Sequence, residues 1–405
     1  MAVQTGVLTT FAFKEEATFG TLPGASSAQY LRRVSCNLST NKDTFASNEV
    51  RSDQQISDVR HGQKSARGTM EGEISCVTYD AFWAALLRGS WVTGVSAAPA
   101  DFATGVTIAN GTESSQKTSD ITFAGAGNLL TKGFKVGDIV RFTGLTQTAN
   151  NNTNLRIVRL TATVMEVFPR ITTQAQQATG WAVATTGRKL AMGNTQRSFT
   201  FERAMDEAAT YEVFSGVRVG GANINVQPNG LATVSFDLMG LGGTPSNTPY
   251  FTTPAAETVT PILSGVDGRV RLAGLERGIV TGVQINMTNN LSMPPVIGTT
   301  TAPNIFYGRM GCTGTVSVYV DSVDIINAFV NETETDLVVQ LEANETVSKS
   351  FLTFNMQRIK FTGAQIQAGP DGGVIAQMPF QALYKTGGTG TAFDAGTLSM
   401  QRSNT

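Results

Sequence analysis

Residues 217–230 read VRVGGANINVQPNG, and residues 359–372 read IKFTGAQIQAGPDG. The two stretches align without a gap at an offset of 142 residues, and each ends in Pro, then Asn or Asp, then Gly. That ending favours a tight turn between two strands. A second copy of the same hairpin predicts that the chain contains an internal duplication.

Two further matches occur in the same order along the chain. Residues 34–41 align with 283–290 at an offset of 249, and the strand pattern that opens at Gly68 aligns with the one that opens at Gly314. The order of elements in each half is therefore strand, long loop, strand and hairpin. Three matches in order predict a duplicated fold.

A short helix is predicted after the second strand of each half. The apolar patterns cover 78–87 and 322–330. Thr78 and Ser322 stand where an N-cap hydroxyl is expected, and an aspartate follows two residues later in each half, in the first turn, where the helix dipole favours it.

The composition indicates a mainly β protein. Of 405 residues, 42 are Gly and 54 are Thr, 41% are hydrophobic and only 15% are charged. Thr favours strands and Gly favours turns, whereas a disordered chain would carry more charge and fewer apolar residues. The formal net charge is −1, so no basic excess is present to bind nucleic acid tightly.

Candidate catalytic and metal-binding residues are scarce. The chain has one histidine, His61, in a charged stretch typical of a solvated loop, and three isolated cysteines, Cys36, Cys76 and Cys312. Nucleophilic triads and zinc sites need more such residues at close spacing. We therefore predict no enzyme, no metal and no cofactor. The sequence also contains no signal-peptide pattern and no apolar run long enough to span a membrane.

The spacing of the matches predicts the domain organisation. Asn37 and Pro228 are 191 positions apart, whereas Asn286 and Pro370 are 84 apart, so the first half carries 107 extra residues. That excess, with its own strand pattern, predicts a small β-domain inserted in a loop, where insertions are tolerated. The predicted parts are a discontinuous first repeat (1–92 and 190–240), the inserted β-domain (93–189), a linker (241–275), a second repeat (276–386) and a flexible C-terminal arm (387–405).

This order of elements resembles the major tail tube proteins of bacteriophages with long non-contractile tails. The opening stretch 13–23, FKEEATFGTLP, and the later stretch 68–74, GTMEGEI, followed at once by the short helix, carry the resemblance together with the duplication. The resemblance implies a β-sandwich or barrel with one helix, in copies that form rings of six folds. Stacked rings would form a tube through which DNA passes, and an inserted domain would lie on its exterior.

The resemblance also implies the partners. A duplicated chain would supply two folds, so three chains would make a pseudo-hexameric ring. The partners would be other copies of the chain and the tape-measure, terminator and distal tail proteins, with DNA only in transit through the lumen and no membrane. The protein would reside in the virion tail after assembly in the host bacterial cytoplasm.

Alternating polar residues on the predicted strands give a candidate lumen surface. These faces are acidic or neutral, and a bore that lets DNA slide should not bind phosphate. A solvated outer face is the other interpretation of the same alternation. The predicted lumen residues are Glu71, Glu73, Ser75, Asn223, Asn225, Thr233, Ser235, Asp237, Thr315, Ser317, Asp321, Gln365 and Gln367.

Two long loops, 41–67 and 290–311, are candidate contacts between rings, because loops of this length inside a compact domain are usually functional or disordered. A solvated loop is the alternative. The predicted contact residues are Glu49, Arg51, Asp53, Asp58, Arg60, Pro294, Pro295, Val296, Ile305 and Phe306.

Other functions remain open from the sequence. The main alternative is a β-rich, tail-associated module that binds surface carbohydrate, as in an adhesin. Such modules often carry clustered exposed aromatic residues, whereas Trp83, Trp91 and Trp181 are scattered. An inner tube of a contractile tail and a tail terminator are nearer alternatives.

Overall fold

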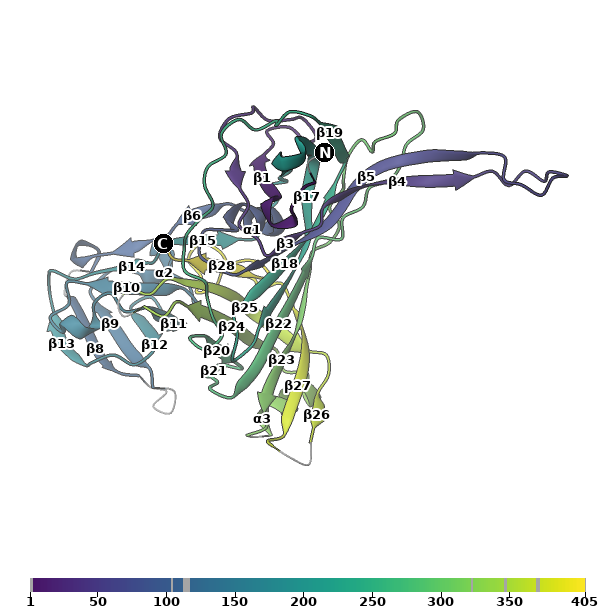
Figure 1. The fold of residues 1–405 in the computed structure, drawn as a ribbon. Coiled ribbons are helices and arrows are strands. Elements are labelled where there is room, and N and C mark those ends of the chain that lie inside the picture. Colours follow the sequence, from purple (N-terminus) through teal and green to yellow (C-terminus); the bar gives the residue numbers. More distant parts are fainter. Residues whose placement is uncertain are drawn as a thin grey trace.

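A computed structural model describes residues 3–102, 105–111, 117–321, 323–345, 348–368 and 372–404. The chain is mainly β, with antiparallel sheets and short helices, which confirms the predicted fold class. Figure 1 shows a body of long strands, a second group of strands to one side, and a hairpin that projects far from the body on the other.

Eight strands lie side by side in the body and form one continuous antiparallel sheet, which we call the wall sheet. Their order is β3 (Ser35–Cys36), β5 (Val59–Glu73), β18 (Thr233–Gly240), β17 (Thr210–Val226), β22 (Val280–Thr288), β23 (Gly311–Tyr319), β27 (Ile375–Ala382) and β26 (Gln365–Gln367). The pairing of β17 with β22 joins strands from the two halves of the sequence.

The wall sheet alternates as period-2 strands should. Residues directly opposite one another on successive strands form a row, and one such row is wholly buried: Met70, Phe236, Ala222, Met287 and Cys312. The other face of the wall sheet is polar and more exposed. The sheet therefore has one core face and one solvent face across both halves.

Strands of the first half complete its core. β1 (Thr10–Glu15), β2 (Gln29–Tyr30), β16 (Phe199–Met205) and β19 (Gly242–Ser246) pair around the first part of β17. Helix α1 (Asp80–Leu87) packs against β17. The ring of Phe236 lies 4.7 Å from that of Trp83 and 5.7 Å from that of Phe82, centroid to centroid. Aromatic burial of this kind contributes strongly to stability.

The second half has a matching set of elements. These are β20 (Arg269–Leu272), β21 (Leu275–Glu276), β24 (Thr335–Glu342), β25 (Phe351–Phe361) and helix α3 (Asp324–Val330). The predicted helices are thus present in both halves and begin two residues later than predicted. The N-cap prediction is wrong for Thr78, because Tyr79 occupies that position and the Thr78 hydroxyl lies 2.6 Å from that of Ser75. Ser322 lies outside the described residues.

The C-terminal segment is not the flexible arm that we predicted. Its strand β28 (Ser399–Arg402) pairs with β25 and with β15 (Arg188–Ala191), which in turn pairs with β6 (Trp91–Thr93). All of β28 is buried, and Arg402 forms an ion pair with Asp80 of α1. The apolar residues Leu398 and Met400 explain the difference, because they enter the main core.

The predicted linker is also integrated into the body. β19 belongs to the sheet of the first half, Ala255 forms a bridge with Gln29, and β20 pairs with β24 of the second half. Leu263, which lies between Ala255 and β20 in the sequence, is fully buried.

A separate sheet accounts for the second group of strands in Figure 1. Its order is β13 (Gln174–Gln177), β8 (Gly105–Asn110), β9 (Ser119–Ala124), β12 (Val164–Phe168), β11 (Leu155–Leu160), β10 (Ile139–Thr143), β14 (Ala182–Thr185) and β7 (Ser96–Ala97), with helix α2 (Leu129–Lys132). Its core is distinct from that of the body and is centred on Phe102, Phe123, Phe142 and Trp181. All these strands lie within the segment predicted as an insertion.

Strand registers repeat between the two halves. Met70 pairs with Phe236, and Val316 pairs with Met378. Val316 follows Met70 by 246 residues, which is the offset from Gly68 to Gly314, and Met378 follows Phe236 by 142, the offset of the hairpin match. Likewise Ile224 pairs with Val234, and Ile366 pairs with Ala376. The match of 34–41 with 283–290 is displaced by two residues, since Ser35 pairs with Glu71 but Gln284 pairs with Thr315.

Candidate assembly surfaces

The polar face of the wall sheet carries most of the predicted lumen residues in two straight rows. Directly opposed residues form the first row, which runs Glu71, Ser235, Asn223, Asn286, Thr313 and Gln381. The second row runs Glu73, Thr233, Asn225, Gln284 and Thr315. Asp237 and Ser317 lie on strands of these rows, and Gln365 and Gln367 lie on the edge strand β26. The sequence therefore placed these side chains on one face, although Asn286, Gln284, Thr313 and Gln381 were missed.

The charges of these rows are acidic only. Glu71 accepts a hydrogen bond from the Ser35 hydroxyl at 2.9 Å. Partial burial raises the pKa of Asp237. Neither row contains Lys or Arg, so the surface is a field of amides and hydroxyls with a few carboxylates at its first-half end. The two rows therefore offer phosphate no cation, although Arg67 of β5 is exposed on the same face beyond them.

Two predicted lumen residues lie elsewhere. Ser75 is only 2% exposed, because it follows the end of β5 and forms a bridge with Ile262. Asp321 follows the end of β23 and forms an ion pair with Arg277 at 3.1 Å. In both cases the strand ends before the alternation does. Ser75 cannot contact a lumen, and Asp321 is directed to the end of the sheet.

The first predicted loop is instead a projecting β-hairpin, which we call the arm. β4 (Ser39–Ala46) pairs with the first part of β5, and residues 47–58 form its tip (Figure 1). The Ser47 amide donates to the Asp58 carbonyl at 2.8 Å and closes the hairpin. The predicted contact residues Glu49, Arg51, Asp53, Asp58 and Arg60 are all exposed. Arg51 and Asp53 pair at 2.8 Å and Arg60 and Asp58 at 2.7 Å, which contributes little at a solvated site.

Apolar residues on the arm are the feature that the sequence reasoning missed. Phe45, Val50, Ile56 and Val59 are all exposed, and Val50 and Ile56 at the tip are 101% and 71% exposed. None of the four belongs to a hydrophobic core cluster of the described residues. Their signal in the sequence is weak, because each stands alone among polar residues.

The second predicted loop lies beside the base of the arm. The Lys64 amide donates to the Thr300 carbonyl at 2.7 Å, and in Figure 1 the loop projects on the same side. Pro294, Pro295, Val296 and Phe306 are exposed, as a contact surface requires. Ile305 is fully buried, so that prediction is wrong; its carbonyl accepts a hydrogen bond from Arg218.

Comparison with known families decides what class of protein carries these surfaces. A model described as phage tail tube protein matches residues 6–382. The chain belongs to the phage tail tube protein family. The resemblance found in the sequence is thereby confirmed at the level of the family, and the tail tube protein is a structural component of the phage tail. A search of curated proteins finds no match.

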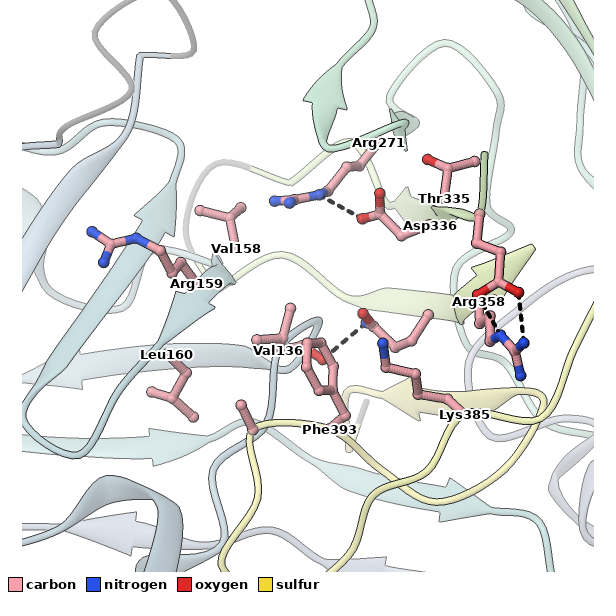
Figure 2. A pocket seen from close by; sticks show the side chains of 13 residues that line it. Val136, Val158, Arg159, Leu160, Arg271, Thr335, Asp336, Arg358, Lys385 and Phe393 are labelled. Atoms are coloured by element: carbon pink, nitrogen blue, oxygen red, sulfur yellow. Dashed lines mark hydrogen bonds and ion pairs between the residues drawn. The ribbon is translucent and has the colours of Figure 1, made fainter. Parts of the chain in front are cut away.

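A cavity of about 450 Å³ separates the inserted strands of this tail tube protein from its second half (Figure 2). Its charged walls are paired: Arg271 with Asp336 at 2.7 Å, and Arg358 with Glu334 at 2.6 Å. The Lys385 ammonium lies 4.3 Å from the centroid of the Phe393 ring. These three contacts lie within the second half and the C-terminal segment. The joint to the inserted strands is made beside the cavity, where Arg156 forms an ion pair with Glu276 and the Gln357 side-chain amide donates to the Val136 carbonyl at 3.1 Å.

The joint has a buried ionic centre nearby. Lys189 pairs with Asp138 and, at 2.6 Å, with Asp394. Burial, together with the neighbouring Asp394 carboxylate, raises the pKa of Asp138 to about 6. These groups tie β10, β15 and the C-terminal segment together.

The candidate metal ligands and the histidine of the tail tube protein form no cluster in the described part of the chain. No group of three or more potential metal ligands occurs among the described residues. His61 is exposed on the arm, where it pairs with Thr44 across the hairpin. No described helix has the length and apolar character that crossing a membrane would demand.

Proposed function

We propose that three copies of this tail tube protein form a ring, and that stacked rings form the conduit for phage DNA. The observation that carries the proposal is the wall sheet, which runs through both halves and presents one polar face without basic side chains in its rows. The repeated strand registers support a duplicated fold, so each chain would contribute two of the six positions around the ring.

The two edges of the wall sheet suggest how the ring closes. Among the described residues, β3 and β26 are each paired on one side only. Within the chain, residues 221–226 of β17 pair with 283–288 of β22. The sequence offset of 142 aligns residues 221–226 of β17 with the segment that contains β26. The offset of 249 aligns β22 with the segment that contains β3. We infer that β26 of one chain pairs with β3 of the next, as β17 pairs with β22. Closure removes the exposed edges, which otherwise favour aggregation.

The dimensions are compatible with DNA passage. Eight strands from each of three chains give 24 strands in the wall. At about 4.8 Å between strands, the circumference is ~115 Å and the diameter between backbones is ~37 Å, before strand tilt widens it. This bore exceeds the width of a DNA duplex. Its amide and hydroxyl rows would let DNA slide, because each basic contact would add affinity and drag.

The arm and the loop beside it would join successive rings. Both project on the same side of the body, and the arm displays apolar residues that need a partner (Figure 1). A head-to-tail contact of this kind is heterologous and repeats without limit, as a tube requires. We place assembly in the host cytoplasm, with tape-measure, terminator and distal tail proteins at the tube, and we assign no enzymatic role. The inserted strands would decorate the exterior.

Negative-stain electron microscopy of the purified protein tests the proposal. We expect hollow tubes whose end-on views show a wall with pseudo-six-fold symmetry and three outer knobs. Six knobs would mean six chains per ring and would overturn the stoichiometry. Compact monomers that stay monomeric at high concentration would overturn the tube itself and favour a surface-binding module, for which glycan binding would be measured next.

A further inference from the structure

The strands of the first half are capped at one end by a segment that leads into the second half. There, the Ile74 amide donates to the Ala232 carbonyl at 2.8 Å. Leu263 completes this pair on its other side: its amide donates to the Ile74 carbonyl at 2.8 Å, and its carbonyl accepts from the Ala232 amide at 3.0 Å. Ile74, Ala232 and Leu263 are all 0% exposed.

The equivalent end of the second half has the same pair without the cap. The Val320 amide donates to the Val374 carbonyl at 2.9 Å, and these residues follow Ile74 and Ala232 by the offsets 246 and 142. Within the part of the chain that the structure describes, the Val320 carbonyl and the Val374 amide have no backbone partner. Val320 is 39% exposed and Val374 is 40% exposed. The second half therefore presents two free backbone groups and an apolar surface where the first half is closed.

The position of the capping segment in the chain identifies its counterpart. Leu263 precedes β20 by six residues, and β20 pairs with the outer strand of the β24–β25 hairpin. In the first half β1 holds the same place, since it pairs with the outer strand of the β16–β17 hairpin. The residue six positions before β1 is Gln4. The counterpart of the capping segment is thus the N-terminal segment, residues 3–8.

The N-terminal segment is suited to such a role. Val3, Val7 and Leu8 are 82%, 90% and 51% exposed, and the short helix Gly6–Leu8 buries no residue. Two exposed hydrogen bonds that involve side chains connect it to Glu207. The Thr5 amide donates to the Glu207 carboxylate at 2.6 Å, and the Glu207 amide donates to the Gln4 side-chain oxygen at 3.1 Å. Exchanging these for water is inexpensive, so the segment is free to move to a better site.

We propose that the N-terminal segment of one chain caps the second half of the preceding chain in the ring, as the segment around Leu263 caps the first half within the chain. Gln4 of the incoming segment lies between Val320 and Val374 and pairs with their free backbone groups, which is strand addition. Val3 and Val7 cover the apolar surface. The occupant is a second copy of this chain, because the segment before the second half caps the fold that precedes it, and the fold that precedes a first half in the ring is the second half of a neighbouring chain. This inference rests on the proposed ring.

Disulfide crosslinking in assembled tubes tests the exchange. The variant carries Gln4→Cys and Val374→Cys, the two positions that the proposal places opposite each other, in a Cys36→Ser background, because Cys36 is the native cysteine that is not buried. We expect oxidation to join chains in series, with dimers and trimers on a non-reducing gel. The matched control pairs Gln4→Cys with Tyr384→Cys, since Tyr384 is exposed in the same half, and it should remain monomeric.

The outcomes separate this inference from the ring itself. Tubes without crosslinks, equal crosslinking in the control, or an intramolecular disulfide in a monomer would each overturn the exchange and leave the tube intact. A ladder that extends to six chains would support the exchange and contradict the three-chain ring. If the wild-type protein forms no rings, the proposed function fails and the exchange fails with it.

A second variant protects the test against misfolding. Val7→Asp changes a side chain that is 90% exposed, so the thermal unfolding temperature should be unchanged. Ring formation at a fixed protein concentration should fall at least tenfold, because the carboxylate would have to lose its water at the apolar cap. Unchanged ring formation would contradict the proposal.

Discussion

The tip of the arm offers the sharpest test of how rings stack, through the double substitution Val50→Asp and Ile56→Asp. In the chain these side chains are 101% and 71% exposed and contact no core. Exposed substitutions away from special features usually change stability by less than about 0.5 kcal/mol. The variant should therefore fold as the wild type does and form the same rings.

The loss on stacking can be worked out from the exposed side chains. Full burial of a Val or Ile side chain contributes about 1.5–3 kcal/mol, so the two together contribute ~3–6 kcal/mol for each arm. Each 1.4 kcal/mol is about tenfold in affinity. Every arm would thus lose two to four powers of ten in its contact with the next ring, before the cost of desolvating two carboxylates is added. With three arms in each ring, tubes should not form at micromolar concentrations.

Electron microscopy and light scattering of the variant, with the thermal unfolding temperature as a check on folding, measure the effect. The matched control is Val92→Asp, which changes an apolar residue that is 56% exposed on β6, away from the arm. Single rings from the double variant and normal tubes from the control are expected. Normal tubes from the double variant would refute the assignment of the arm to the ring–ring contact.

Three further predictions concern the lumen, the core and the joint. Asn286→Lys would add three cations to each proposed ring, so DNA ejection by phage carrying it should be slowed at low salt and restored at high salt. The reason is that each phosphate contact adds about −0.9 to the slope of log affinity against log salt concentration. An ejection rate that does not depend on salt would exclude Asn286 from the bore. Phe236→Ala removes a fully buried ring that packs on Trp83 and should lower the free energy of unfolding by about 3–5 kcal/mol in urea titrations, and a loss under 1 kcal/mol would contradict this packing. The pKa of Asp138 is raised to about 6 from 3.8 by burial, so the folded state holds its proton more tightly and the free energy of unfolding should fall as pH rises from about 4 to 6. Asp138→Asn should remove that part of the slope in urea titrations at pH 4, 5, 6 and 7, while Lys189 keeps its pair with Asp394; an unchanged slope would exclude Asp138 as its source.

Local pattern was sufficient to predict the elements that face a core on one side. The face of Ser235 and Asn223 follows from periodicity alone, because one side of each strand is apolar. The helices at 80–87 and 324–330 follow from the short apolar run that each half contains after its second strand, and in the first of them Phe82 to Leu87 are all buried. The N-cap at Thr78 failed for a tertiary reason. Its hydroxyl is within hydrogen-bonding distance of Thr258, which belongs to a distant part of the chain.

Elements stabilised by distant partners could not be read from local pattern. The arm has no buried face along most of its length, so its strands show no period-2 alternation and resemble a loop. β28 follows a Gly-rich stretch, and only its pairing with β25 and β15 makes it a strand. Ile305 looked like an exposed contact because its loop is rich in proline, yet it packs inward while its neighbour Phe306 stays exposed.

The junction between β17 and β22 has a consequence for the kinetics of assembly. It places one seam between folds inside the covalent chain, where the effective concentration of the two edges is set by the linker and not by the amount of protein in the cell. The proposed ring of six folds would then have three seams between molecules instead of six. Every closed ring must also contain an even number of folds, so five-fold and seven-fold rings are excluded as assembly errors.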